Sequence, residues 1–352
     1  MHHNSYNVQN LHNNFLPDMQ WSLPITIKPP NRLVEYPSKL MLMGSCFSEH
    51  IGTGLSDLKF DVLQNPHGIL FAPDAIIQAL HDYIQAREYS LQDLFQLEGI
   101  WYSWNHHSRF SDPDPSIVVD GINSSIQQAH QFVKQTDFLI ITLGSAFSYR
   151  LTELAVLSSK GMNNPVANCH RAPANWFKKE LMGIDHLVAS LGNIIQELRK
   201  INPTISIFFT ISPVRHIRDG VQENNRSKAR LFETIQRLEE KDNTLYYFPA
   251  YELIVDVLRD YRFYDIDLVH PNYAATEFVI NHFLTTCLTT KAQELAAQIK
   301  KIQLAYRHRP QHPNSQSHQQ FLTHLLDKTQ ALQKNFPFLD FTNELNHFKA
   351  ND

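Results

Sequence analysis

The chain changes from strand to helix within Lys39-Leu-Met-Leu-Met-Gly44-Ser45-Cys46-Phe47-Ser48-Glu49-His50-Ile51-Gly52. The four apolar residues 40–43 are too few for a helix, but they suffice for a strand buried on both faces. After Gly44 the apolar residues recur at helical spacing, so a helix should begin near Ser45 and Cys46. A hydroxyl and a thiol are therefore expected at the carboxyl end of a strand. Ligands of open α/β sheets bind at this edge, where a helix amino terminus favours negative charge.

A second stretch, Asp265-Ile-Asp267-Leu-Val-His270-Pro271, lies in a predicted loop before a helix. An Asp three residues before a His can accept a hydrogen bond from Nδ1–H, which fixes the tautomer and leaves Nε2 free to take a proton. By itself the pattern is more typical of a solvated Asp and a His at a helix end. Paired with a nucleophile turn at the same sheet edge, it predicts a catalytic triad of Cys46 or Ser45, His270 and Asp267.

Five short apolar runs alternate with helical patterns along the chain. The runs are 40–43, 60–64, 137–143, 204–211 and 244–248. Strands that alternate with helices of ten or more residues form a parallel sheet. We therefore predict an α/β fold, a three-layer α/β/α sandwich around a five-stranded doubly wound parallel sheet with strand order 2-1-3-4-5. A hairpin is expected within 147–172, followed by a long helix over about 174–200.

The sequence predicts three parts. Residues 1–38 are punctuated by proline and indicate an extended arm, residues 39–290 indicate the α/β/α domain, and residues 291–352 indicate a C-terminal helical extension. A linker rich in Pro, His and Ser over 307–318 interrupts this extension. Its helices are candidate oligomerisation elements.

Composition narrows the function classes. Among 352 residues, 43% are hydrophobic and 19% charged, and the formal net charge of −4 argues against nucleic acid as a partner. The 19 His are scattered, and neither an H-E-x-x-H nor a C-x-x-C pattern occurs, so we expect no metal and no cofactor. Three Cys (Cys46, Cys169, Cys287) fit a reducing compartment.

The first 31 residues carry no basic stretch followed by an apolar one, as a signal peptide would, and no apolar run approaches the length of a membrane span. The prediction is therefore a cytoplasmic protein with no membrane partner.

Several separated motifs resemble those of the GSCFA-domain family, within the wider SGNH/GDSL hydrolase clan. They occur in order over about residues 20–310. They are Gly44-Ser-Cys-Phe-Ser48, Asn65-Pro-His-Gly68, Thr142-Leu-Gly-Ser-Ala146, Asn168-Cys-His170, Ser212-Pro-Val-Arg-His216, Asn225-Arg-Ser-Lys228 and Tyr261-Arg-Phe-Tyr264 leading to Asp267-Leu-Val-His-Pro271. The resemblance implies an SGNH-hydrolase or flavodoxin-like sheet and ester chemistry on acylated small molecules or carbohydrates. The GSCFA family itself implies no settled substrate.

The resemblance also assigns roles at the nucleophile turn. The nucleophilic serine is third in the clan's G-D-S-x turn, which places Cys46 at that position and Ser45 where Asp usually stands. We favour Cys46 over Ser45, with the alternatives of a shifted turn or a non-catalytic site. A thiol beside an imidazole at a helix amino terminus is expected to have a lowered pKa.

The clan's G-x-N motif supplies an oxyanion amide, and here Gly144 begins it while Ala146 stands in the place of Asn. Candidate oxyanion donors are then the backbone N–H groups of Cys46 and Gly68 and the side chain of Asn168. The remaining candidates for substrate binding are His170, Arg215 and His216. Cys46 and Cys169 are a candidate redox pair, and the alternative for residues 168–170 is a turn packed against the sheet edge.

The first functional hypothesis is an esterase that acts on an acylated small molecule or carbohydrate. Acyl transfer at the same site is a variant of it. A non-catalytic ligand-binding module that keeps the fold is the second hypothesis, favoured by Ala146 and the Ser/Cys shift and opposed by the intact pair Asp267 and His270.

Overall fold

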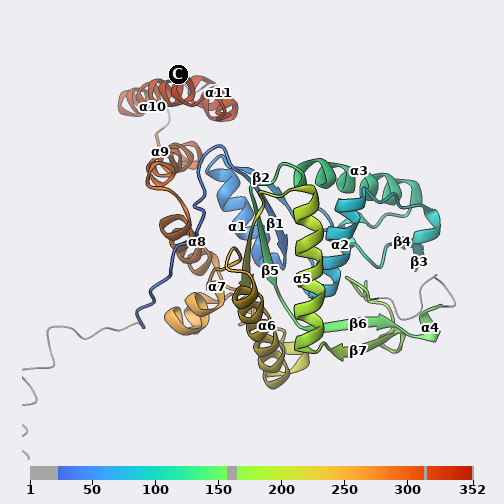
Figure 1. The fold of residues 1–352 in the computed structure, drawn as a ribbon. Helices are drawn as coiled ribbons and strands as arrows, with labels where there is room; N and C mark the ends of the chain where they lie inside the picture. The colour runs from blue at the N-terminus through green and yellow to red at the C-terminus, as the bar shows by residue number, and fades with distance from the viewer. Residues whose placement is uncertain (1–22, 157–164, 313–314, 351–352) are drawn as a thin grey trace, which may run out of the picture.

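The computed structural model describes residues 23–156, 165–312 and 315–350. In this part of the chain the central sheet has five parallel strands in the spatial order β2-β1-β5-β8-β9 (Figure 1). The strands are β1 (Lys39–Gly44), β2 (Asp61–Gln64), β5 (Phe138–Leu143), β8 (Ser206–Ile211) and β9 (Tyr246–Tyr247). Numbered along the chain, this order is 2-1-3-4-5. The predicted sheet and its strand order are confirmed.

Helices cover both faces of the sheet because successive strand residues point to opposite sides. Met41 and Met43 of β1 belong to one apolar cluster with α2, α3, α5 and α6, whereas Leu40 and Leu42 belong to the other with α1, α8 and α9. These helices are α1 (Cys46–Asp57), α2 (Pro73–Gln85), α3 (Pro115–Val133), α5 (Ile184–Ile201), α6 (Val221–Lys241), α8 (Tyr273–Cys287) and α9 (Thr290–Arg307). The three-layer α/β/α sandwich is confirmed (Figure 1).

The carboxyl ends of the five parallel strands meet at one edge of the sheet. The chain leaves this edge at Ser45 after β1, at 144–146 after β5 and at 212–220 after β8, the last of which includes the turn η5 (Ile217–Asp219). After β9 come α7 (Ala250–Glu252), the π-helical η6 (Leu253–Leu258) and η7 (Tyr261–Phe263). Every motif of the predicted triad therefore leaves the sheet at the same edge.

Two small hairpins extend from the sandwich. β6 (Phe147–Leu151) pairs with β7 (Phe177–Leu181), with α4 (Glu153–Val156) and η4 (Ala174–Trp176) between them (Figure 1). β3 (Phe95–Leu97) pairs with β4 (Ile100–Tyr102), flanked by η2 (Leu91–Asp93) and η3 (Ser108–Phe110). The boundaries predicted for the β6–β7 hairpin (within 147–172) and for the helix that follows it (about 174–200) were wrong. Residues 177–181 lie in the predicted helix, but they pair with β6 as a strand, and α5 begins only at Ile184.

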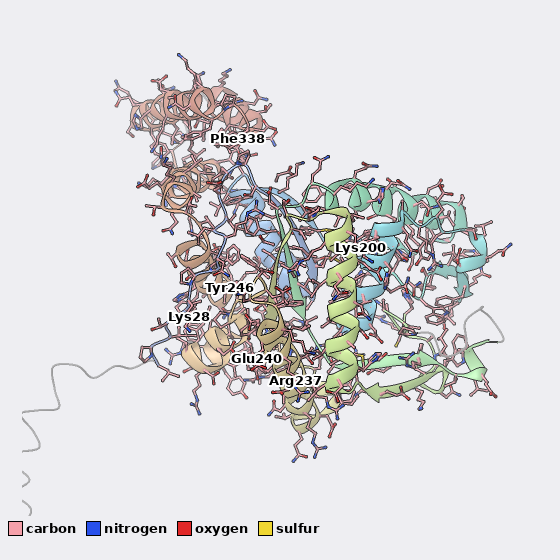
Figure 2. All side chains as sticks on the ribbon, in the orientation of Figure 1. Lys28, Lys200, Arg237, Glu240, Tyr246 and Phe338 are labelled. Atoms are coloured by element: carbon pink, nitrogen blue, oxygen red, sulfur yellow. The ribbon has the colours of Figure 1, made fainter. Side chains whose placement is uncertain are left out.

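The predicted C-terminal helical extension is present as α9, α10 (Gln316–Asn335) and α11 (Thr342–Ala350), with α10 and α11 set beyond α9 (Figure 1). Glu344 of α11 is buried, and its Oε1 lies 2.7 Å from Lys59 Nζ, which joins α11 to the end of α1. Phe338 stacks on Tyr36 of the arm with ring centroids 6.3 Å apart, and Figure 2 shows Phe338 where the helix pair meets the rest of the chain.

The described part of the arm, residues 23–38, contains no helix and no strand, and Val34 N–H donates to Cys287 O at 2.8 Å. Among the described residues, no helix has both the length and the apolar character needed to cross a membrane.

Candidate active site

The loop before α8 holds Asp267 and His270 as a hydrogen-bonded pair. His270 Nδ1 and Asp267 Oδ2 are 2.6 Å apart, and Asp267 Oδ1 accepts from the backbone N–H groups of Val269 (2.9 Å) and His270 (3.0 Å). These bonds, first of all the one to the imidazole, lower the pKa of Asp267 to about 2. The carboxylate is thus ionised at neutral pH and fixes the ring with Nε2 directed away from it. Both side chains are nearly half exposed (46% and 45%), so solvent and a ligand can reach the pair.

The turn after β1 requires glycine at position 44. Gly44 has φ +131°, and a Cβ there would collide with the backbone carbonyl of Thr142 on the neighbouring strand β5. Ser45 follows as the N-cap residue of α1, and its N–H donates to Thr142 O at 3.3 Å. This contact locks the start of α1 against the end of β5.

The turn places the hydroxyl and the thiol in different surroundings. Ser45 is 1% exposed, and its Oγ has no hydrogen-bond partner among the described residues. Cys46 begins α1 and is a partly exposed free thiol. Of the two candidate nucleophiles, only Cys46 reaches the surface.

The pKa of the Cys46 thiol is raised, and burial is the main cause. The amides of Phe47 and of Cys46 itself lower it, as does the positive charge of Lys228, while Glu49 raises it. The expectation of a lowered thiol pKa is therefore wrong, because desolvation at this position outweighs the helix amino terminus. The resting thiol is protonated and needs a base to become a nucleophile.

No hydrogen bond joins the His270 imidazole to Cys46 or Ser45 in the described residues. Cys46 follows β1 and the His270 loop follows β9. Because these strands are parallel, both groups come after strand ends at the same edge of the sheet. Catalytic hydrogen bonds are often long before substrate binds, so the lack of a direct bond does not exclude His270 as a base for Cys46.

The two glycines proposed near the oxyanion position already use their N–H groups. Gly68 N–H donates to Asn65 O at 2.7 Å, and Gly144 N–H donates to Phe71 O at 2.9 Å. The prediction that Gly68 offers a free donor is wrong, because its positive φ (+83°) closes a turn back onto Asn65. Ala146, which stands where the clan has Asn, is buried, and its N–H donates to Ser227 Oγ at 2.7 Å.

Asn168 and His170 lie in an aromatic cluster beside the β6–β7 hairpin. Asn168 Oδ1 accepts from His170 N–H at 2.8 Å, and the buried His170 ring bonds Ser103 O through Nε2 at 2.8 Å. The ring packs against Tyr102, with centroids 4.7 Å apart. Cys169 packs on the same cluster as a free thiol, so the structure contains no Cys46–Cys169 disulfide. The segment is thus a packed turn, but it packs on the hairpin cluster rather than against the edge of the central sheet.

Arg215 and His216 follow β8 and flank the His270 loop. The Arg215 guanidinium stacks on Tyr264, with Cζ 4.7 Å from the ring centroid. The backbone N–H of Arg215 donates to Val269 O at 3.4 Å. Burial, the charge of Lys228 and, to a smaller extent, His270 lower the pKa of His216 to about 4, while Asp219 opposes this shift. His216 is therefore neutral at neutral pH, and it lies close enough to Lys228 and His270 for both groups to influence its pKa.

Lys228 is the site residue that the role assignment missed. It lies on the buried face of α6, with Ser227, Leu231 and Ile235, and is 2% exposed. Its Nζ donates to Gly144 O and to Ser212 O, each at 2.6 Å. A lysine on the apolar stripe of an amphipathic helix was the available signal.

None of three well-formed cavities contains a residue of the predicted triad. A cavity of about 900 Å³ lies between the arm and the amino ends of β8 and β9, bordered by Arg32, Glu239 and Tyr246. The triad residues thus lie at the opposite edge of the sheet. Within the described residues there is also no cluster of three or more His, Cys, Asp or Glu that could hold a metal ion.

The GSCFA family model matches residues 39–283, which hold both the nucleophile turn and the His270 loop. The chain belongs to the GSCFA family. The model for the C-terminal domain of GSCFA-domain proteins matches residues 299–351, which include α10 and α11.

A search of curated proteins found no match to this GSCFA chain. Among solved structures it is similar to an acetyl xylan esterase (Est2A) from the rumen bacterium Butyrivibrio proteoclasticus, at 11% sequence identity and a TM-score of 0.35. The similarity covers 71% of this chain and 63% of the esterase chain.

Proposed function

We propose that this GSCFA protein is an SGNH-type hydrolase that cleaves an acyl ester, with Cys46 as nucleophile, His270 as base and Asp267 as the group that orients the base. One observation carries the proposal: the 2.6 Å bond between His270 Nδ1 and Asp267 Oδ2 lies at the sheet edge where Cys46 begins α1. The substrate class, an acylated small molecule or carbohydrate, follows from the resemblance to the SGNH/GDSL clan.

In the first half-reaction, Cys46 Sγ attacks the acyl carbonyl carbon while His270 Nε2 takes the thiol proton. The carbonyl electron pair moves onto oxygen, and the ionised Asp267 stabilises the imidazolium that forms. The carbonyl then re-forms, the bond to the alcohol oxygen breaks, and the alcohol leaves with the proton from His270. A thioester on Cys46 remains.

In the second half-reaction, water attacks the thioester and gives its proton to His270. The carboxylic acid leaves, and Cys46 regains its proton. An alcohol that takes the place of water would receive the acyl group instead, so acyl transfer uses the same residues in the same roles.

Exposure supports Cys46 over Ser45 as the nucleophile. An acyl carbon must approach the attacking atom to about 3 Å, and Ser45 is 1% exposed. The raised pKa of Cys46 explains why this thiol would need His270 as a general base rather than standing as a preformed thiolate.

Acid quenching during turnover of p-nitrophenyl acetate tests the proposal. We expect one acetyl group on the tryptic peptide Leu40–Lys59, which contains Ser45 and Cys46 and no other cysteine. Fragment spectra should place the acetyl group on Cys46. Cys46→Ala should abolish it, and His270→Ala should slow its formation.

Cys169→Ala is the matched control, because Cys169 is also a partly exposed free thiol but packs on the hairpin cluster. It should keep full acetylation of the Leu40–Lys59 peptide. An acetyl group on Ser45 would make the protein a serine hydrolase, and a folded protein that acquires no acetyl group on this peptide would not be a hydrolase of this type.

A non-catalytic binding module is the second candidate, because the N–H groups of Gly68 and Gly144 are already bonded within the protein. A site with few free donors stabilises an oxyanion poorly, and loss of one donor elsewhere costs about 10²- to 10³-fold in kcat. Absence of acetylation together with unchanged folding would favour this candidate.

A further inference from the structure

Lys228 is a buried cation with no carboxylate partner. Within the described residues no Asp or Glu forms an ion pair with it, and two of its three protons are donated to the carbonyls of Gly144 and Ser212. A charged group rarely lies in a protein interior without a counter-charge, because desolvation opposes it. We therefore expect the charge of Lys228, or its hydrogen bonds, to serve a function.

The two carbonyls place the ammonium group at the edge where the triad lies. Gly144 directly follows β5 and Ser212 directly follows β8, so Lys228 bridges the ends of two adjacent strands. On the other side of β5, Gly44 is in register with Thr142. Cys46 lies two residues beyond Gly44, just as Gly144 lies two residues beyond Thr142.

Charge interactions agree with this placement. Lys228 lowers the pKa of Cys46, and Cys46 in turn raises the pKa of Lys228. The other groups that face this region are Glu49 of α1, which raises the thiol pKa, His216 of the loop after β8, and the Tyr251 ring of α7, whose centroid lies 6.0 Å from Lys228 Nζ. Because His216 is neutral at neutral pH, the buried positive charge among these side chains is that of Lys228.

We propose that Lys228 supplies the buried positive charge that stabilises the Cys46 thiolate, held in place by the carbonyls of Gly144 and Ser212. It is a positioning residue that acts through Cys46. This inference deepens the proposed function, since it concerns the nucleophile of that reaction, but the Lys228–Cys46 interaction can be measured without any substrate.

The lysine keeps its proton during acylation. The thiol proton goes to His270, the new bond forms between Sγ and the acyl carbon, and the ammonium group stabilises the negative charge through the field it exerts at Cys46. Burial lowers the pKa of Lys228 to about 7, so this charge is present below neutral pH and is lost above it.

The rate of Cys46 alkylation by iodoacetamide as a function of pH tests the inference. In the wild type, the charge of Lys228 should increase the thiolate fraction below pH 7, and this increase should fade as the lysine deprotonates. Lys228→Met should lower the rate about tenfold at pH 6, and the difference from wild type should shrink toward pH 9. Lys228→Arg, which is charged at every pH, should retain the increase above pH 7.

Ser227→Ala is the matched control. Ser227 neighbours Lys228 on α6 and bonds the same loop, through Ser145 Oγ at 3.1 Å and Ala146 N–H, but carries no charge. If Lys228 only holds the loops after β5 and β8 in place, Ser227→Ala and Lys228→Met should change the alkylation rate by similar factors, and each factor should be the same at every pH. That result would contradict the inference. Circular dichroism of each variant establishes folding. If Lys228→Met does not fold, the wild-type dependence of the Cys46 alkylation rate on pH decides: an inflection near pH 7 supports the inference, and its absence contradicts it.

The same profiles in a His270→Ala background separate the two proposals. The Lys228 effect should persist there, because it does not pass through the imidazole. A Lys228 effect without acetylation by p-nitrophenyl acetate would leave this inference standing and remove the hydrolase. Acetylation of Cys46 without a pH-dependent Lys228 effect would do the reverse.

Discussion

Two histidine–aspartate pairs of this molecule use the same side chains in opposite surroundings. His270 and Asp267 lie on a surface loop with their atoms 2.6 Å apart, and both are nearly half exposed. His67 and Asp82 lie 3.1 Å apart in the core, and each is 1% exposed. The first pair leaves its imidazole accessible, whereas the second is buried, and its histidine is the residue directly before Gly68.

The buried pair has no nitrogen left for chemistry. His67 Nε2 bonds Asp82, and the Tyr83 hydroxyl donates to Nδ1 at 2.8 Å. Asp82 also accepts from Tyr89 and Gln78, at 2.8 and 2.9 Å. Burial lowers the pKa of His67, which keeps the ring neutral. This arrangement fixes the position of the loop and leaves neither ring nitrogen free to take a proton.

The difference shows what separates a base from a structural histidine. Both rings are oriented by a carboxylate, so orientation does not distinguish them. Only His270 has a second nitrogen without a partner in the described residues, and only His270 can be reached from solvent. Access and a free nitrogen are therefore the testable marks of the proposed base.

His270→Ala should have the largest effect on function. We expect kcat/KM for p-nitrophenyl acetate to fall about 10²- to 10⁴-fold, because the protonated Cys46 thiol loses its base. The melting temperature should stay within a degree or two of wild type, since exposed side chains contribute little to stability (about 0.5 kcal/mol). Steady-state kinetics and thermal unfolding check both statements, and wild-type turnover in the variant would remove His270 from the mechanism.

Asp82→Ala should have the opposite signature. It leaves the donors of His67, Tyr89 and Gln78 without an acceptor in the core, at a cost of about 3 kcal/mol in the free energy of unfolding. Urea unfolding measures this loss. Asp82→Asn, which keeps the size and one acceptor oxygen, should lose less, and Asp267→Ala should leave the unfolding midpoint nearly unchanged. Equal losses for the two aspartates would contradict the comparison.

The sheet and the surface pair could be predicted because both depend on short stretches of sequence. Runs such as Phe138–Leu143 are apolar without interruption, which is the pattern of a strand buried on both faces. Asp267 and His270 are three residues apart, so their hydrogen bond is a local event. The parallel topology then brings their loop to the edge where Cys46 begins α1.

The errors concern contacts between distant residues. The N–H of Gly144 bonds Phe71, which comes from the segment before α2, and nothing near Gly144 in the sequence indicates it. The pKa of Cys46 depends on how much of the thiol is buried, which only the assembled fold decides. Lys228 was visible on the apolar face of α6, but its bonds to Gly144 and Ser212 required the assembled sheet.

Lys228→Met should change how stability depends on pH. The pKa of Lys228 is about 7 in the folded protein and about 10.4 in an unfolded chain, so the unfolded state binds more protons between these values. Wild-type stability should therefore rise with pH relative to Lys228→Met, by roughly 1.4 kcal/mol per pH unit between pH 7 and 9. Urea unfolding at pH 6, 7, 8 and 9 measures the difference, and parallel curves would show that the lysine stays protonated in the folded protein up to pH 9.

Arg215→Leu should have the smallest effect and should be confined to the surface pair. The guanidinium stacks on Tyr261 and Tyr264, and Arg215 N–H donates to Val269 O beside His270. Loss of a partly exposed stacked cation costs about 0.5–1 kcal/mol. Hydrogen–deuterium exchange should quicken in residues 265–270 and remain unchanged in residues 65–68, because the His67 pair makes no contact with this arginine in the described structure. Faster exchange in both loops would mean that the two pairs are mechanically coupled, and that the buried pair influences the orientation of His270.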